Sequence, residues 1–81
     1  MEPSPETAFG RVLRRTRRER DLSQEALADK AGLARNHVSE IERARRDPRL
    51  TTLVHIADAL GMGLGELLTL FDEERADPTS A

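Results

Sequence analysis

Hydrophobic residues recur at intervals of three and four positions in five segments of the chain, which is the spacing of one face of an α-helix. We therefore expect helices at about residues 7–20, 24–31, 34–42, 50–60 and 64–72. Glycines and prolines stand between several of these segments, where helices end. Eighty-one residues are enough for one small domain. The pattern predicts an all-α fold.

Residues 23 to 43 contain two of these helical segments, joined by a tight turn. Ser23 can cap the first segment, and Gly32 can end it, because glycine tolerates a positive φ. Ala28 is small where the two helix backbones would cross. The inward positions are Leu27, Ala31, Leu33, Val38 and Ile41. This spacing is typical of a helix-turn-helix unit, whose second helix enters the DNA major groove.

The second helix of this unit would turn its polar side chains outward. Arg35 can donate to O6 and N7 of guanine, Asn36 can pair with adenine, and Glu40 can accept from N4 of cytosine. We predict that the base-reading residues are Arg35, Asn36, Ser39 and Glu40, and that Arg43 meets a phosphate. The competing interpretation is an ordinary solvated helix face.

The distribution of charge changes what the net charge implies. A net charge of −2 argues against a nucleic-acid partner. However, residues 11–70 carry twelve basic and nine acidic side chains, whereas residues 71–81 carry one basic and four acidic ones. The predicted core is thus basic and its ends are acidic. Phe9 and Phe71 are the only aromatic residues, so duplex DNA fits better than single strands, which are usually stacked on aromatic side chains.

Two runs in the chain, Leu22–Gly32 (LSQEALADKAG) and Val38–Arg43 (VSEIER), resemble the phage-repressor, Cro-like helix-turn-helix family, also called the xenobiotic-response-element family. The resemblance covers about residues 8 to 70. It implies a compact five-helix repressor-like bundle with the helix-turn-helix at the second and third helices. We expect a domain at residues 7–73, a disordered arm at 1–6 and a flexible acidic tail at 74–81.

The resemblance implies a sequence-specific, double-stranded DNA-binding transcription regulator that acts as a homodimer. The size is similar to that of restriction-modification controller proteins, which bind their own promoters as dimers and both activate and repress. Neither the operator nor the regulated gene follows from the sequence. The sequence leaves two alternatives open: an antitoxin that binds a toxin protein and represses its own gene, and a protein-interaction module without DNA binding.

The resemblance also assigns roles to single residues. Gln24 corresponds to a glutamine that binds a DNA phosphate and braces the recognition helix. Arg17 and Glu42 correspond to a structural ion pair. Glu25 and Asp29 correspond to acids that contact RNA polymerase in some family repressors, although a solvated face with favourable N-terminal charge also explains them.

The chain departs from the family pattern at two positions. Ala34 replaces the usual Ser or Thr at the start of the recognition helix, so a capping hydrogen bond is missing. Ala44 replaces the usual Gly after that helix, and a Cβ penalises a left-handed backbone. The resemblance therefore does not fix the path of residues 45–48. Three predicted phosphate contacts depend on this path: Arg45, Arg46 and Arg49.

The last predicted helix carries more apolar side chains than one face can bury. Such an excess often marks a partner surface. We therefore predict a homodimer interface made by Leu64, Leu67, Leu68 and Phe71.

The composition argues against several other kinds of site. There is no cysteine, and His37 and His55 are separated, so we expect no metal, cofactor or small-molecule ligand. Serines and histidines form no recognisable catalytic set, so we expect no enzyme. No apolar run approaches the roughly 18–20 residues of a membrane helix, and the N-terminus lacks a signal-peptide pattern. We expect a cytoplasmic, nucleoid-associated protein without membrane contact.

Overall fold

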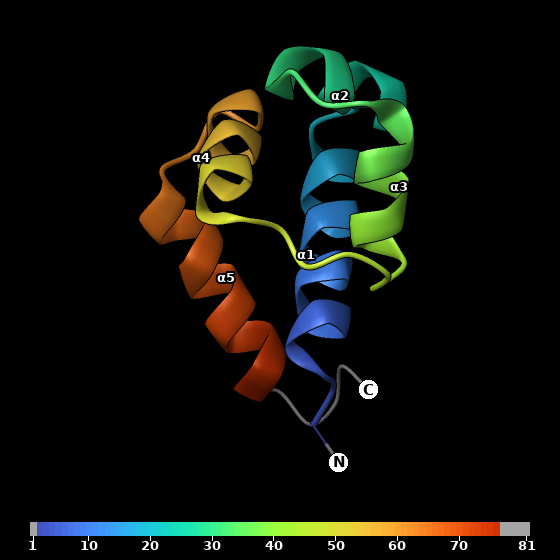
Figure 1. The fold of residues 1–81 in the computed structure, drawn as a ribbon. Coiled ribbons are helices and arrows are strands. Elements are labelled where there is room, and N and C mark those ends of the chain that lie inside the picture. Colours follow the sequence, from blue (N-terminus) through green and yellow to red (C-terminus); the bar gives the residue numbers. More distant parts are fainter. Residues whose placement is uncertain (1, 77–81) are drawn as a thin grey trace.

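The computed structural model describes residues 2 to 76. Within this range the chain forms five α-helices and no strand, which confirms the predicted all-α fold (Figure 1). The helices are α1 (Pro5–Glu19), α2 (Gln24–Ala31), α3 (Arg35–Glu42), α4 (Leu50–Ala59) and α5 (Leu64–Ala76). The bounds of the three middle helices agree with the sequence pattern to within one residue.

The first and last helices are longer at their outer ends than the pattern predicted. α1 begins at Pro5, because the hydroxyl of Ser4 accepts from the backbone N–H of Thr7 at 3.1 Å and caps the helix. Thr7 is therefore inside the helix, and the last residues of the predicted disordered arm are helical. α5 continues to Ala76, so the first three residues of the predicted tail are helical too. The remainder of that tail, 77–81, lies outside the described residues.

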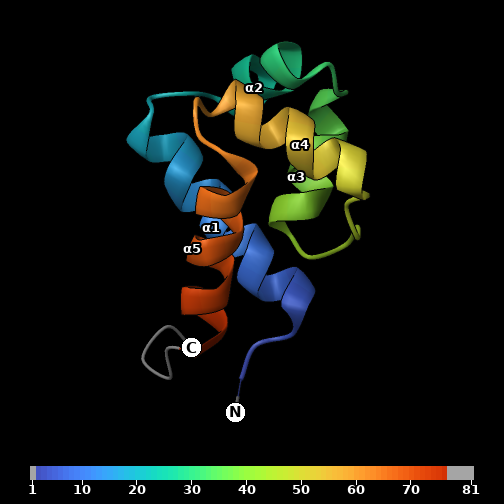
Figure 2. The same ribbon diagram turned by 90° about the vertical axis from the view of Figure 1, so that its left-hand side faces the viewer.

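α1 lies between two pairs of helices (Figures 1 and 2). α2 and α3 contact each other, and α3 packs along α1. α4 and α5 also contact each other, with α5 along α1 and α4 against α2. No single helix in the described range is long and apolar enough to cross a membrane. α4 and α5 taken together reach the required length and apolar composition, but they are bent by 103° relative to each other.

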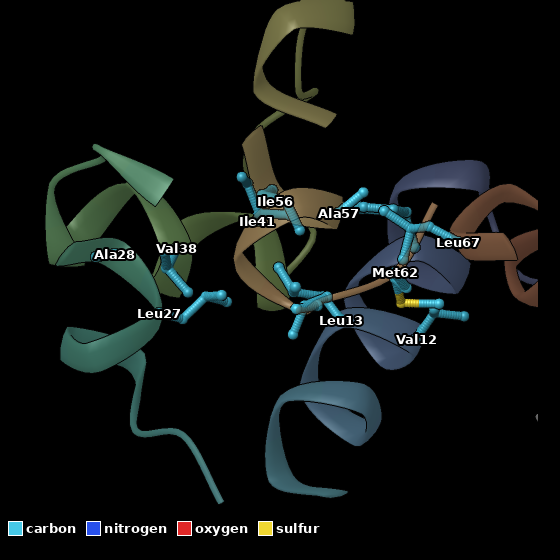
Figure 3. Close-up of a cluster of buried hydrophobic side chains, with 12 residues drawn as sticks. Val12, Leu13, Leu27, Ala28, Val38, Ile41, Ile56, Ala57, Met62 and Leu67 are labelled. Carbon is cyan, nitrogen blue, oxygen red and sulfur yellow. The ribbon is translucent and has the colours of Figure 1, made fainter. Parts of the chain in front are cut away.

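The hydrophobic core receives a fully buried aliphatic side chain from every helix (Figure 3). These side chains are Leu13, Leu27, Ile41, Ile56 and Leu67, in helix order. A fully buried leucine contributes about 1.5–3 kcal/mol by leaving water. Leu67 is 0% exposed within its own chain, so its side chain is not available to a partner. Its predicted place in a dimer interface is corrected accordingly.

Each of the first four helices is followed, within two residues, by a residue with a left-handed backbone. Glycine takes this position after α2 and α4, where Gly32 has φ +69° and Gly61 has φ +71°. The other two left-handed residues are not glycine: Asp21 after α1 has φ 55° and Ala44 after α3 has φ 61°. Ala44 therefore adopts a left-handed conformation that glycine favours, in spite of its Cβ, and α3 ends at Glu42.

Close packing between α1 and α3 depends on Gly10. A Cβ on this residue would lie 2.7 Å from the carbonyl oxygen of Glu42 and 2.8 Å from that of Ile41. Both atoms belong to the backbone and cannot rotate away. Gly10 thus allows the end of α3 to rest directly on α1.

Candidate nucleic-acid interface

The turn between α2 and α3 follows from local signals in the sequence. The Ser23 hydroxyl accepts from the backbone N–H of Ala26 at 3.0 Å and caps α2. After the left-handed Gly32, the N–H of Leu33 donates to the Ala28 carbonyl at 2.8 Å, which closes the helix end. Ala28 is buried, with 1% exposure, and its small side chain allows α3 to pack closely against α2. This arrangement is the predicted helix-turn-helix unit.

Four of the predicted site residues lie around one hollow on the surface. Arg35 and Asn36 at the start of α3 are exposed, and Ser39 one turn later is half-buried. Together with Gln24, the first residue of α2, they line a hollow of about 260 Å³. Val38 and Ile41 on the opposite side of α3 are buried. The sequence thus predicted correctly which face of α3 is free.

Glu42 connects this surface to the rest of the fold. Its buried carboxylate accepts from Nε and Nη2 of Arg17, at 2.6 and 3.1 Å, and from the side-chain amide of Gln24 at 3.1 Å. Arg14 adds a longer contact of 3.4 Å, and Nη1 of Arg17 donates to the Leu22 carbonyl at 2.8 Å. The predicted Arg17–Glu42 pair is confirmed. Together with Gln24, the pair joins α1, α2 and α3 at one point.

The contacts of Glu42 keep it ionised. Burial penalises the charged carboxylate, but hydrogen bonds from Arg17, Gln24 and Arg14, with the charge of Arg17, outweigh this penalty and lower the pKa of Glu42 below its ordinary value. Gln24 uses one of its two amide hydrogens in this network and has a second that can reach a ligand. A glutamine that braces α3 is therefore compatible with one that binds a phosphate.

The left-handed Ala44 returns the chain toward the outer side of α3. The N–H of Arg45 donates to the Glu40 carbonyl at 2.8 Å, and the N–H of Ala44 donates to the Ile41 carbonyl at 3.1 Å. Arg46 then lies beside the Glu40 side chain, whose Oε1 accepts from Nε at 3.1 Å and from Nη2 at 2.7 Å. The sequence had assigned Glu40 to a base and Arg46 to a phosphate. The structure joins them in one ion pair.

A second hollow, of about 210 Å³, lies between α3 and the start of α4. It is lined by His37, Arg46, Asp47, Arg49 and Thr52. Partial burial, together with the charge of Arg46, lowers the pKa of His37, against the opposite effect of Glu40. Two of the predicted phosphate contacts, Arg46 and Arg49, therefore share one hollow. Arg43 and Arg45 are exposed on the same loop.

The two acids predicted to contact RNA polymerase, Glu25 and Asp29, are exposed on α2. Asp29 also lines a shallow hollow with Lys30, His55 and Asp58. No group of three or more His, Cys, Asp or Glu residues in the described part of the chain could hold a metal ion.

The exposed apolar surface lies more on α4 than on α5. Leu50 is 69% exposed and Val54 is 37% exposed, one turn apart. They are close in sequence to Pro48 and Leu53, which line an apolar groove of about 180 Å³ together with Pro5, Glu6, Phe9, Asp47, Leu68 and Phe71. Phe71 packs edge-on against Phe9, with ring centroids 6.1 Å apart. Leu64, Leu68 and Phe71 are all half-buried.

Sequence reasoning missed several features that join one helix to another or to the loop beside it. Gly10 was a signal in principle, because a glycine inside a helix costs about 1 kcal/mol relative to alanine, so its presence there suggests close packing. The Glu40–Arg46 pair had no such signal, since it depends on the unexpected turn at Ala44. Neither did Glu74, which is buried and accepts from Nη1 of Arg15 at 2.9 Å across 59 residues of sequence.

Comparison with known proteins agrees with the predicted resemblance. Residues 13 to 67 match a family model described as helix-turn-helix. The chain is 40% identical over 74 residues to the immunity repressor protein of Bacillus phage phi105, across 88% of this chain and 51% of that protein. The chain therefore spans about half the length of this curated relative.

Two solved structures extend the comparison to controller proteins. The restriction-modification controller protein C.AhdI from Aeromonas hydrophila superposes with a TM-score of 0.77 at 37% identity, covering 80% of this chain and 98% of that one. The restriction-modification controller protein C.Esp1396I, as a tetramer in complex with its natural 35 base-pair operator, superposes with a TM-score of 0.85 at 26% identity. That match covers 94% of this chain and 100% of the other.

Proposed function

This chain belongs to the helix-turn-helix family, and we propose that it is a transcription regulator that binds duplex DNA in a sequence-specific manner. One observation carries the proposal. Arg35, Asn36 and Ser39 present hydrogen-bonding groups on the free face of α3, while the opposite face is buried in the core. A rigid helix with this face can place its side chains at base edges in the major groove.

In the proposed complex, Arg35 and Asn36 read bases and Ser39 contributes a smaller contact. Each good bidentate contact discriminates against a wrong base by about 1–3 kcal/mol. The residues proposed to bind phosphates flank α3 on both sides: Gln24, Arg43, Arg45, Arg46 and Arg49. Such contacts add affinity for every sequence and make binding salt-dependent.

We propose further that two copies bind together, because helix-turn-helix dimers read half-sites about one helical turn apart. The surface that we assign to the contact is made by Leu50, Val54, Leu64, Leu68 and Phe71. It keeps three residues of the predicted α5 interface and adds the two exposed apolar residues of α4. Large apolar side chains that stay exposed in the single chain, such as Leu50 and Val54, are typical of a surface covered by a partner.

The controller proteins among the similar structures suggest the biological role. We propose that this chain likewise binds an operator near a promoter, inside the cell where chromosomal DNA lies. Exposed Glu25 and Asp29 on α2 are then the residues through which it would contact RNA polymerase. The charge reversal Glu25→Lys should abolish activation of a reporter while operator affinity is retained, and unchanged activation would reject this contact.

The test of DNA binding starts from the purified full chain and a library of random duplexes. Selection should enrich one two-fold symmetric sequence. Binding to that sequence should weaken by a factor on the order of 10³ or more between about 50 and 200 mM salt if six or more phosphates are contacted. Failure to bind any duplex at low salt would overturn the proposed function and would favour a protein-interaction module.

A further inference from the structure

The pairing of Glu40 with Arg46 changes what Glu40 can do on the DNA-facing surface. The sequence suggested that its carboxylate reads a cytosine, which requires the carboxylate to be aimed at a base edge. In the structure, Oε1 accepts two hydrogen bonds from Arg46. The side chain of Glu40 is 33% exposed and that of Arg46 is 45% exposed, so both remain near solvent.

The pair with Glu40 occupies one edge of the planar Arg46 guanidinium and leaves a second edge for another partner. Nε and Nη2 point at the carboxylate. An arginine carries five N–H donors in a planar fork, so Nη1 and the outer hydrogen of Nη2 are directed away from Glu40. This remaining edge has the shape that binds two oxygens of one phosphate. A carboxylate on one edge and a phosphate on the other would hold the guanidinium between them.

The backbone supports the same arrangement. The left-handed turn at Ala44 and the hydrogen bond from the Arg45 N–H to the Glu40 carbonyl bring the loop back beside α3. Arg46 also lines the hollow that contains Arg49 and His37. A free arginine side chain loses up to about 2 kcal/mol of rotamer entropy when it is fixed. An ion pair that already fixes it reduces this loss on binding.

We propose that Glu40 is a positioning residue, which acts on DNA through Arg46 and does not read a base. This inference rests on the proposed DNA-binding function. Glu40 holds Arg46 on the outer side of α3 so that the free guanidinium edge meets a phosphate beside the major groove. The contribution of Glu40 to DNA affinity is then equal for all duplex sequences, and it is lost when Arg46 is replaced. The lowered pKa of Glu40, caused by hydrogen bonding to Arg46 and by its charge, keeps the carboxylate ionised.

The test is a double-mutant cycle of Glu40→Gln and Arg46→Gln on the selected duplex and on duplexes with single base changes. Glu40→Gln should weaken binding about two- to five-fold for every duplex, the range expected of an exposed ion pair. Arg46→Gln should reduce the slope of log affinity against log salt by about 0.9. In the Arg46→Gln background, Glu40→Gln should have no further weakening effect.

Asp47→Asn is the matched control, because it removes an acid from the same loop without touching the pair. Simple repulsion between an acid and DNA predicts stronger binding, and Asp47→Asn should show this. If Glu40→Gln also strengthens binding to all duplexes, Glu40 only repels DNA and the proposal is wrong. If it changes the preference at one base pair in both backgrounds, Glu40 reads a base and the proposal is equally wrong.

A measurement without DNA separates this proposal from the proposed function. In ¹⁵N NMR spectra of the free chain, the Nε–H signal of Arg46 should be ordered and protected from rapid exchange. It should lose both properties in Glu40→Gln, while circular dichroism stays unchanged. A wild-type chain that shows this ordered signal but binds no duplex would overturn the DNA-binding function. A mobile Arg46 side chain in the wild-type protein would overturn the positioning role.

Discussion

At the residue scale, the ion pair between Glu42 and Arg17 should make stability depend on pH. The folded-state pKa of Glu42 is lowered, so the unfolded chain binds a proton first as pH falls. The stabilisation is therefore complete above the unfolded pKa of about 4.3 and is lost as pH falls through the folded pKa. Glu42→Gln should cost on the order of 1–3 kcal/mol at pH 7.

Urea unfolding at a series of pH values checks this prediction. The difference in unfolding free energy between wild type and Glu42→Gln should shrink as the pH falls below the unfolded pKa of glutamate, about 4.3. Glu73→Gln is the control, because Glu73 is exposed, lies far from the first turn of its helix and should change stability little. A difference that stays constant with pH would mean that the charge of Glu42 contributes nothing.

Ala44 provides a second prediction at this scale, because it holds a left-handed φ of 61° with a Cβ. Ala44→Gly should raise the unfolding free energy by about 0.5–1 kcal/mol, the left-handed penalty less the entropy that glycine adds to the unfolded chain. Gly61→Ala should lower the unfolding free energy, because φ is also positive there. A Cβ on Gly61 would meet nothing within 4 Å, so only the backbone conformation opposes the alanine. Thermal unfolding measures the change in stability of each variant. If both variants are stabilised or both are destabilised, this explanation is wrong.

At the element scale, the packing of α1 on α3 should depend on the missing side chain of Gly10. Gly10→Ala should destabilise the fold by about 1–3 kcal/mol even though alanine favours helices, because its Cβ would overlap backbone oxygens. Gly65→Ala in α5 is the matched control, since nothing lies within 4 Å of its Cβ and stability should be kept or raised. If Gly10→Ala stabilises the fold as well, the close approach is not limiting.

How much of each element the sequence predicted depends on where its signals lie. The bounds of α2 were predicted because Ser23 and Gly32 act on neighbouring residues. The extension of α5 was not, since Glu74 gains its partners, Arg11 and Arg15, only after α5 has packed on α1. Local patterns therefore predicted the helices and the free face of α3. They could not predict contacts made by distant residues or by a strained turn.

At the scale of the whole molecule, the proposed dimer surface is open to a direct test. Leu50→Glu should convert the dimer to a monomer, because it places a charge at the most exposed apolar residue of that surface. The fold of the single chain should survive, since Leu50 is 69% exposed. Sedimentation velocity gives the mass, with Lys30→Glu on α2 as the control for an added acid. An unchanged mass would place the contact elsewhere.

The claim on which the rest depends is that α3 reads base edges while the surrounding arginines hold the phosphates. The most direct measurement is the affinity of Arg35→Ala and Asn36→Ala for the selected duplex and for duplexes changed at each position. Each variant should lose about ten-fold or more on the selected sequence and become indifferent to one particular base pair. Arg75→Gln, which removes a charge from α5 on the other side of α1 (Figure 1), should keep the full preference. If Arg35→Ala and Asn36→Ala also keep it, α3 does not read the sequence.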